Sequence, residues 1–375
     1  MIALAYLFPV IAIVILKTVL HLDSEWTVFL WIFIAGEGTV GLLHIGIVLF
    51  QTLKTEYLGS IVKSIHFEDS WTELIENKKY KKNSKGEFYP VKTVREKYHY
   101  PKYYFYTTRN SKIKTDSSFY KYVLNQWQKT PQYLSWADNH IKGGTRYGES
   151  CSADYNGIFE TCDNSKWVSV TEQHLYLNRI TQSYSIFRHK DISKKEAYKL
   201  GLYFYPNKYF HDIPCILYDH CKNYLPDYEI TKKFQRFNGV FAPRNQMRLF
   251  ILLFESGKGL DIAVAQKNFW QGGNKNEFVI CLGISSKRKV EWSFVFSWAD
   301  EQEIEIETQQ WFLKNKNLDL NKFYDWFLQK YNRWKRKEFK DFKYIRIPLD
   351  IWQIMVIYVL SIFENIMAIK IALEN

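Results

Sequence analysis

Two short apolar runs decide the fold of the soluble part of this chain. Residues 248–254 read RLFILLF, and residues 277–284 read EFVICLGI. A continuous apolar run of this length, bounded by turn residues, is typical of a strand buried on both faces of a sheet. Gly257 and Gly259 follow the first run, and the residues after them read as a helix. The pattern predicts a strand–helix–strand unit at the centre of an α/β fold.

The residues that follow extend this unit. Alternating apolar side chains at 290–298 predict a third strand, and Asp300 with Glu303 resembles a capping pair for a helix. One apolar stripe at helical spacing over 320–334 predicts a further helix. We therefore expect a compact, sandwich-like α/β domain at 241–340.

The region before this domain, 51–240, is rich in Tyr and Lys and weakly periodic, so we expect a mixed α+β region that packs on the domain. Ser193 and Glu196 form a capping box, and Gly201 suits the end of the same short helix. Weaker patterns predict a helix at 119–127 and strands at 60–67, 103–108 and 168–180.

Composition limits the class of protein. The chain has 375 residues, of which 47% are hydrophobic and 24% charged, and its net charge is +12. These values exclude a disordered chain, a collagen-like repeat and a small disulfide scaffold. A mean hydropathy of −0.31 argues against a polytopic transporter. Both ends of the chain are nevertheless strongly apolar.

Three apolar stretches are candidate membrane spans. The first two, about 2–20 and 27–50, predict a transmembrane helical hairpin over 1–50, and the third predicts a C-terminal anchor within 347–375. A cleaved signal peptide is the rival interpretation of the first stretch. That stretch lacks a basic start and a small-residue cleavage site, and a second apolar segment follows almost at once. We therefore expect a multi-pass protein of the cytoplasmic membrane.

Basic residues favour one side of the membrane for the soluble region. Residues 314–346, directly before the last span, hold 11 basic and 4 acidic side chains, whereas only Lys17 and Lys370 lie in the two opposite segments. Positive charge favours the cytoplasm. Long domains can cross a membrane regardless of charge, so the outside remains the alternative.

Three ionisable residues lie inside the predicted spans, where such groups are costly. Glu37 and His44 are seven residues apart, so they share one face of a helix together with Gly41, and Glu364 lies in the last span. One interpretation is a proton or ion path through an oligomer. The other, which we favour, is helix packing through hydrogen bonds and close glycine contacts.

The most distinctive string is the loop 271–277 (QGGNKNE), which joins the predicted helix to the second buried strand. Asn274, Asn276 and Glu277 offer oxygens that suit a hard cation or a polar ligand. Lys258 lies in the turn after the first buried strand, but the spacing there is not that of a phosphate-binding P-loop. An ordinary structural turn is the simpler interpretation of both loops.

Histidines and cysteines offer two further candidates. Four of them fall within eleven residues, in spacings that match no common closed zinc site: His211, Cys215, His220 and Cys221. Cys151 and Cys162 flank a polar loop and suit a disulfide if the region lies outside the cytoplasm. We expect no cofactor, with a divalent cation as the alternative.

Basic residues are interleaved with aromatic ones at two places, namely Lys121, Tyr122 and Trp127, and Arg333, Trp334, Lys335 and Arg336. Such patches can bind nucleic acid, but beside membrane anchors they more often contact anionic headgroups, which is the partner we favour. Self-association or a membrane protein partner is also expected. The chain shows no local catalytic signature such as GxSxG.

The stretch 246–335 resembles the TPM domain, a family of membrane-anchored proteins linked to photosystem repair and assembly. The resemblance lies in the two buried strands, the helix ending in Trp270, and the Gly loop with Asn276. It implies an α/β sandwich, usually extracytoplasmic, with cation binding or phosphatase activity suggested for some members. Glu277 departs from the small residue usual in the family, and acidic cation ligands have no match here, so catalysis is not carried over. The chain as a whole also looks like membrane proteins of bacteria and their phages.

Three functions follow as hypotheses. The first is a non-catalytic integral membrane protein that presents a basic, aromatic-rich soluble domain for protein assembly or membrane-surface interaction. The second is a membrane-anchored hydrolase of phosphate esters, with the 271–277 loop and Lys258 at its site. The third is an oligomeric proton or ion conductor that uses Glu37, His44 and Glu364.

Overall fold

The structure, a computed structural model, describes residues 5–19, 26–82, 85–153, 166–184, 186–206 and 214–374. The chain forms two compact units. The first unit comprises Met1–Thr55, Leu175–Lys190 and Glu338–Asn375, and the second comprises Glu56–His174 and Asp191–Lys337. The second unit therefore contains the predicted α/β domain and most of the region before it.

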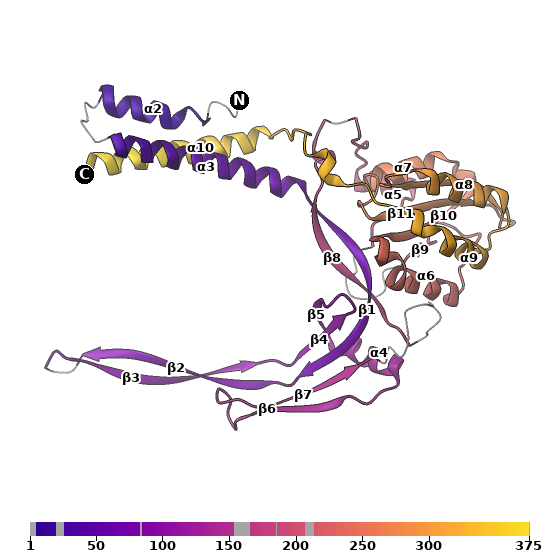
Figure 1. Ribbon diagram of the computed structural model, residues 1–375, viewed down its shortest axis with the longest axis horizontal. Helices are drawn as coiled ribbons and strands as arrows, with labels where there is room; N and C mark the ends of the chain where they lie inside the picture. Colours follow the sequence, from indigo (N-terminus) through magenta and orange to yellow (C-terminus); the bar gives the residue numbers. More distant parts are fainter. Residues whose placement is uncertain are drawn as a thin grey trace. The chain divides into compact units, whose positions relative to one another are not determined.

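The first unit is built on apolar helices. Its elements are α2 (Phe8–Val14), the π-helix η1 (Ile15–Val19), α3 (Trp26–Thr52) and α10 (Ile351–Glu374). These three α-helices lie side by side (Figure 1). Ala5, Val40 and Ile357 are fully buried where they meet.

Two of these helices, α3 over Phe33–Thr52 and α10 over Ile351–Ile371, are long and apolar enough to cross a membrane. Most of their apolar side chains are exposed, which sets them apart from the core helices of a soluble protein. Among the described residues, the first predicted span forms α2 and η1. Pro9 lies in the first turn of α2, where a missing N–H is tolerated, so the helix begins there.

Two further segments of the first unit contain no α-helix. We call residues 175–184 and 338–350 the collar. They contact each other through the rings of Tyr176 and Phe339, whose centroids are 5.5 Å apart. Short 3-10 turns at Ile180–Gln182 and Phe339–Phe342 shape the two segments.

The α/β part of the second unit has a four-stranded sheet in the order β12-β11-β10-β9. The strands are β9 (Ile216–Leu217), β10 (Arg248–Glu255), β11 (Glu277–Ile284) and β12 (Val290–Ser297). β9, β10 and β11 are parallel and β12 is antiparallel. Every residue of β11 is buried, as its continuous apolar run predicts.

Helices cover both faces of this sheet (Figure 1). One face packs against α6 (Tyr228–Val240), α8 (Glu303–Lys314) and α9 (Leu320–Lys330). The other face packs against α5 (Lys194–Leu200) and α7 (Asp261–Phe269). The domain is therefore a three-layer α/β fold.

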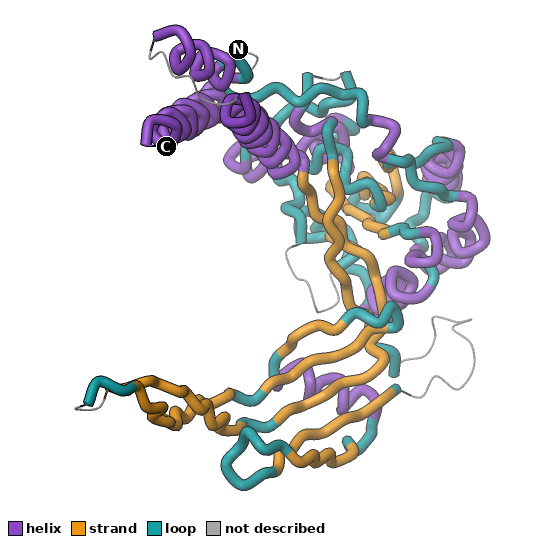
Figure 2. Tube along the Cα trace, turned by 60° about the vertical axis from the view of Figure 1, so that its left-hand side comes forward, coloured by secondary structure: helices purple, strands orange, loops and turns teal. Residues whose placement is uncertain are grey.

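The rest of the second unit is an antiparallel sheet in the order β5-β4-β1-β7-β6, with β8 also paired to β1. Its elements are β1 (Leu53–Glu68), β4 (Lys102–Thr107), β5 (Lys112–Thr115), α4 (Ser117–Trp127), β6 (Gln132–Ala137), β7 (Thr145–Ser152) and β8 (Ser169–Leu177). β2 (Trp71–Lys82) and β3 (Phe88–His99) form a two-stranded sheet of their own, a long hairpin that extends from this sheet (Figure 2), and Glu73 of β2 forms one isolated bridge with Ile141. The sequence patterns did not predict this hairpin.

Two predicted helix starts have different outcomes. The Ser193 hydroxyl accepts a hydrogen bond from the Glu196 N–H at 3.2 Å, and Gly201 ends that helix with a positive φ, as predicted. The predicted capping pair of Asp300 and Glu303 is wrong. α8 begins at Glu303, and the preceding Gln302 makes no side-chain cap.

Candidate functional site

Contacts with neighbouring residues occupy the polar side chains of the loop 271–277. Asn276 and Glu277 are fully buried. The Asn276 side-chain amide donates to the Tyr57 carbonyl at 2.7 Å, which attaches the loop to β1. Lys275 pairs with the buried Glu56 at 3.7 Å. The loop thus connects two parts of the second unit.

The buried Glu277 carboxylate accepts several hydrogen bonds from neighbouring residues. These come from the Asn274 N–H at 2.9 Å, from the Asn274 side-chain amide at 2.8 Å, and from the Tyr205 hydroxyl. Arg248, which is buried and pairs with Glu277 in the strand register, adds a nearby positive charge. Burial raises the pKa of Glu277 despite these partners, and burial together with the adjacent Glu277 carboxylate raises the pKa of Tyr205.

Lys258 lies at the other end of the sheet. β10 and β11 are parallel and in register from Arg248–Glu277 to Glu255–Ile284. The loop 271–277 therefore precedes the strands, whereas Lys258 follows them, roughly 25 Å away at about 3.3 Å per residue. The Lys258 ammonium donates to the Leu200 carbonyl at 3.4 Å. The structure does not bring Lys258 and the 271–277 loop into one site.

The predicted metal and disulfide residues fall partly outside the described residues. His211 and Cys162 are among the residues that are not described, so the zinc site and the Cys151–Cys162 disulfide remain predictions. Within the described residues, no three His, Cys, Asp or Glu side chains converge on a point that could hold a metal ion. Cys215 and Cys221 are buried core residues, and burial lowers the pKa of His220.

The ionisable residues of the candidate membrane spans lie near other helices of the first unit. The Thr39 hydroxyl of α3 donates to the Glu364 carboxylate of α10 at 2.9 Å. His44 lies 3.5 Å from the Tyr6 hydroxyl, and Glu37 is half-buried on the same helix as His44. The Thr39–Glu364 contact is of the kind that holds helices together in a membrane.

Part of each basic, aromatic patch contributes to packing, whereas Lys121, Tyr122 and Lys335 are exposed. Trp127 and Trp334 are buried. Arg333 pairs with Glu303 at 2.5 Å and with Glu307 at 2.8 Å. These side chains are therefore engaged within the second unit.

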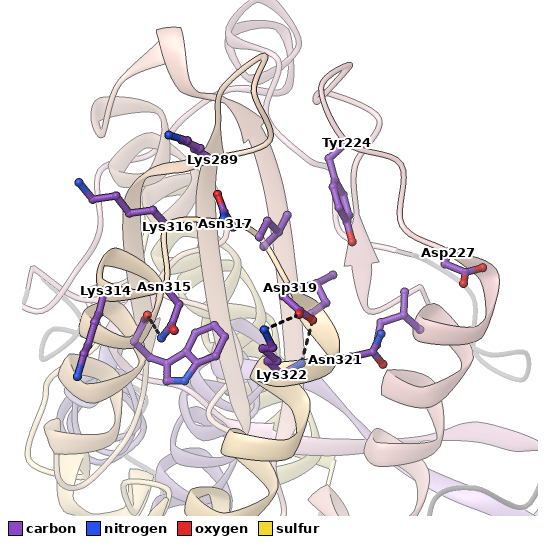
Figure 3. A pocket seen from close by; sticks show the side chains of 14 residues that line it. Tyr224, Asp227, Lys289, Lys314, Asn315, Lys316, Asn317, Asp319, Asn321 and Lys322 are labelled. Atoms are coloured by element: carbon purple, nitrogen blue, oxygen red, sulfur yellow. Dashed lines mark hydrogen bonds and ion pairs between the residues drawn. The ribbon is translucent and has the colours of Figure 1, made fainter.

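A pocket of about 810 Å³ lies at the carboxyl edge of the parallel strands. Its walls are the loop after β9, the β11–β12 turn, the end of α8 and the start of α9 (Figure 3). Fourteen residues line it: Tyr224, Asp227, Ile230, Lys289, Trp311, Lys314, Asn315, Lys316, Asn317, Leu318, Asp319, Leu320, Asn321 and Lys322. We call it the lysine pocket.

Backbone hydrogen bonds hold the α8–α9 loop against the β11–β12 turn. The Val290 N–H donates to the Lys316 carbonyl at 2.7 Å, and Lys289 and Asn317 form a β-bridge. Asp319 caps α9 by accepting from the Lys322 N–H at 3.0 Å. The wall that carries the lysines is therefore part of the folded framework.

The charges of the pocket are unbalanced. Its four lysines are exposed, and only Lys322 has an ion pair among the described residues, with Asp319 at 3.6 Å. Lys289, Lys314 and Lys316 lie on one side, and Tyr224 and Asp227 on the other (Figure 3). Burial, reinforced by the Asp319 carboxylate, raises the pKa of Tyr224, so its hydroxyl stays protonated as a hydrogen-bond donor.

This arrangement suits an anionic ligand. Lysine ammonium groups bind phosphate as point charges, asparagine amides can donate to its oxygens, and Trp311 and Tyr224 offer aromatic surface. Ligands of α/β sheets bind outside the carboxyl ends of the strands, where this pocket lies. The sequence analysis missed the site, although the string KNKNLDLNK at 314–322 was a visible signal.

Comparisons with known protein families, curated proteins and solved structures find no match for this chain. The resemblance of residues 246–335 to the TPM domain therefore stays a prediction.

Proposed function

We propose that this chain is an integral membrane protein whose soluble unit binds a small phosphate-bearing ligand in the lysine pocket. The observation that carries the proposal is the group of three lysines, Lys289, Lys314 and Lys316, that have no ion pair among the described residues yet line one concave site. The positive charges of these exposed lysines would attract an anion that enters the site. The proposal specifies what the soluble domain predicted from the sequence would bind.

The two long apolar helices support the membrane part of the proposal. Their exposed apolar residues would contact lipid, while polar contacts join the helices to each other. Thr39 binds Glu364, and the Gln51 side chain donates to Gln353 at 2.8 Å. These two pairs fit an antiparallel arrangement of α3 and α10, with the soluble region between them in sequence. We favour helix packing over ion conduction as the role of Glu364 for this reason.

The size and lining of the pocket support a small ligand. Ligand pockets commonly measure about 300–1,000 Å³, and this one measures about 810 Å³. A nucleotide-like molecule would match it in size, because its phosphates would be attracted to the lysines of the lining and its ring could contact Trp311 or Tyr224. The proposal concerns ligand binding alone.

The test is a binding titration of the full-length protein in detergent with a fluorescent ATP analogue, followed by competition with pyrophosphate. The native protein should bind both. The double variant Lys289→Gln/Lys316→Gln should lose roughly tenfold or more in affinity, because each charge-assisted contact contributes about 1.5–3 kcal/mol.

The matched control is Lys92→Gln/Lys97→Gln in the β2–β3 hairpin. It removes the same charge from exposed lysines that pair with Glu76 and Glu73 at 3.6 and 3.9 Å. The control should bind like the native protein. Equal loss in both double variants would reduce the effect to net charge, and no binding by the native protein would end the proposal.

The side of the membrane is a separate part of the proposal. The net charge of residues 314–346 supports a cytoplasmic soluble unit. Cysteine introduced at Lys85 or Asn317 should resist an impermeant thiol reagent in intact cells and react after lysis, relative to the parent protein. Labelling in intact cells would place the unit outside.

A further inference from the structure

The first unit contains a second pocket, of about 760 Å³, at the ends of its two long helices. Its residues come from α3, from the start of α10 and from both segments of the collar: His44, Ile45, Val48, Leu49, Arg179, Tyr184, Arg346, Ile347, Pro348, Leu349 and Ile354. All of them belong to the first unit. We call it the collar pocket.

One wall of this pocket is apolar and belongs to the helices. Val48 and Leu49 lie in the last turns of α3, which ends at Thr52, and Ile354 lies in the first turn of α10, which begins at Ile351. Leu49 is 44% exposed although it lines the pocket. Apolar surface left uncovered in a concave site indicates an apolar occupant.

The opposite wall is basic and belongs to the collar. Arg179 and Arg346 both line the pocket, and neither forms an ion pair with the described residues. No acidic side chain is among the residues that line it. Two arginines in the lining of one cavity, with no carboxylate among its lining residues, indicate an anionic group in the ligand.

Hydrogen bonds fix the collar at this position. Arg179 donates one N–H to the Ile345 carbonyl at 3.1 Å, which leaves four of its five N–H donors for a ligand. The Asn178 N–H donates to the Thr52 carbonyl at 2.8 Å, which holds the collar at the end of α3. The arginine is therefore positioned before any ligand arrives.

We propose that the collar pocket binds one phospholipid with an anionic headgroup. Its phosphate lies between Arg179 and Arg346, and an acyl chain runs along the exposed apolar side chains of α3, Ile45 and Leu49. This occupant has both chemistries that the walls require, and it is present at the level where apolar helices leave a membrane. The inference rests on the membrane anchoring proposed above but not on the lysine pocket.

The experiment measures lipid retained by the full-length protein in a mild detergent, by native mass spectrometry after incubation with phosphatidylglycerol or phosphatidylcholine. The native protein should retain one phosphatidylglycerol in preference to phosphatidylcholine. The variant Arg179→Gln/Arg346→Gln should bind phosphatidylglycerol roughly tenfold or more weakly, because charge-assisted hydrogen bonds to phosphate are lost.

Lys340→Gln/Lys343→Gln is the matched control, since it removes two charges from exposed collar residues that do not line the pocket. It should retain phosphatidylglycerol like the native protein. Equal weakening in both variants, or no preference for the anionic lipid, would overturn the site. Displacement of the lipid by millimolar inorganic phosphate would instead show a site for free phosphate.

Val48→Trp provides a second test that keeps both arginines. The larger ring would fill the apolar part of the pocket, so lipid retention should fall while the protein still purifies as a folded species. Unchanged retention in this variant would contradict the proposed path of the acyl chain. Failure of the membrane anchoring itself would appear differently, as a protein that alkaline carbonate extracts from membranes.

Discussion

The two edges of the parallel sheet in the second unit differ in the burial of their polar residues. At the amino edge, Glu56 and Glu277 are buried; Glu56 forms an ion pair with Lys275, and Glu277 accepts a hydrogen bond from the Asn274 side chain. At the carboxyl edge, Lys289 and Lys316 are exposed and have no ion pair among the described residues. Both loops look polar and distinctive in the sequence. The lysines of the second loop are exposed to a ligand, whereas the polar groups of the amino edge are enclosed, including the Arg248 Nε and Nη1 atoms, which have no hydrogen-bond partner among the described residues.

The difference teaches that a polar loop should be judged by its partners. Burying a charged group costs free energy unless hydrogen bonds and opposite charges compensate, so the amino-edge groups must contribute to folding. Exposed lysines cost little in the folded chain, so their placement is free to serve binding. The comparison predicts large stability effects at one edge and binding effects at the other.

The largest effect is expected for Glu277→Ala. The change leaves the Asn274 and Tyr205 donors unsatisfied and the buried Arg248 without its nearby carboxylate. We expect a loss of about 3–5 kcal/mol, or roughly 6–10 °C in melting temperature, measured by scanning fluorimetry in detergent. Glu277→Gln, which keeps the shape and one acceptor, should lose less. Equal losses in both variants would show that the charge of Glu277 does not matter.

A pH-dependent effect is expected at Glu305, a buried residue near the start of α8. Burial raises the pKa of Glu305 to about 7, and Lys267 opposes this only in part. Between pH 4.5 and 7 the folded chain binds more protons than the unfolded chain, so the stability contributed by this residue falls as pH rises through that window.

Glu305→Gln removes this penalty. At pH 8 the variant should be more stable than the native protein by at most about 3 kcal/mol, and at pH 5 by less than about 1 kcal/mol, in melting curves at both pH values. The exposed Glu301→Gln is the control and should show no difference that depends on pH. A native protein that is equally stable at pH 5 and 8 relative to Glu305→Gln would refute the assignment.

The apolar parts of the fold could be predicted from the sequence because burial leaves a local pattern. The runs at 248–254 and 277–284 correspond to β10 and β11, and the alternation at 290–298 corresponds to β12. The hairpin at 71–99 was missed because most of its side chains are exposed on both faces, so no alternation of apolar residues marks it.

The candidate site could not be predicted for a different reason. The buried Glu277 accepts a hydrogen bond from Tyr205, which lies 72 residues away in the chain. Local sequence patterns cannot predict such a long-range contact. The lysine pocket combines Tyr224, Lys289 and the string at 314–322, each ordinary by itself. The sheet brings them to one edge.

A smaller stability effect is expected for Asn276→Ala. The substitution removes the 2.7 Å hydrogen bond to the Tyr57 carbonyl and leaves that carbonyl buried without this donor. We expect a loss of about 1–3 kcal/mol in a melting experiment. Asn276→Asp should lose at least as much, because it places an acceptor against the carbonyl. A neutral result would show that the loop is not needed to attach β1.

The smallest stability effect is expected for Lys289→Gln/Lys316→Gln at the other edge. The Lys316 carbonyl accepts from the Val290 N–H through the backbone, so changing the side chain leaves that contact in place. Stability should change by no more than about 0.5 kcal/mol, as for exposed positions without special contacts. Ligand affinity should fall in the same sample, and the affinity of the native protein should weaken as salt is raised, because exposed charges are screened. A melting temperature lowered as much as in Asn276→Ala would mean that these lysines, too, serve the fold, and the contrast between the two edges would be lost.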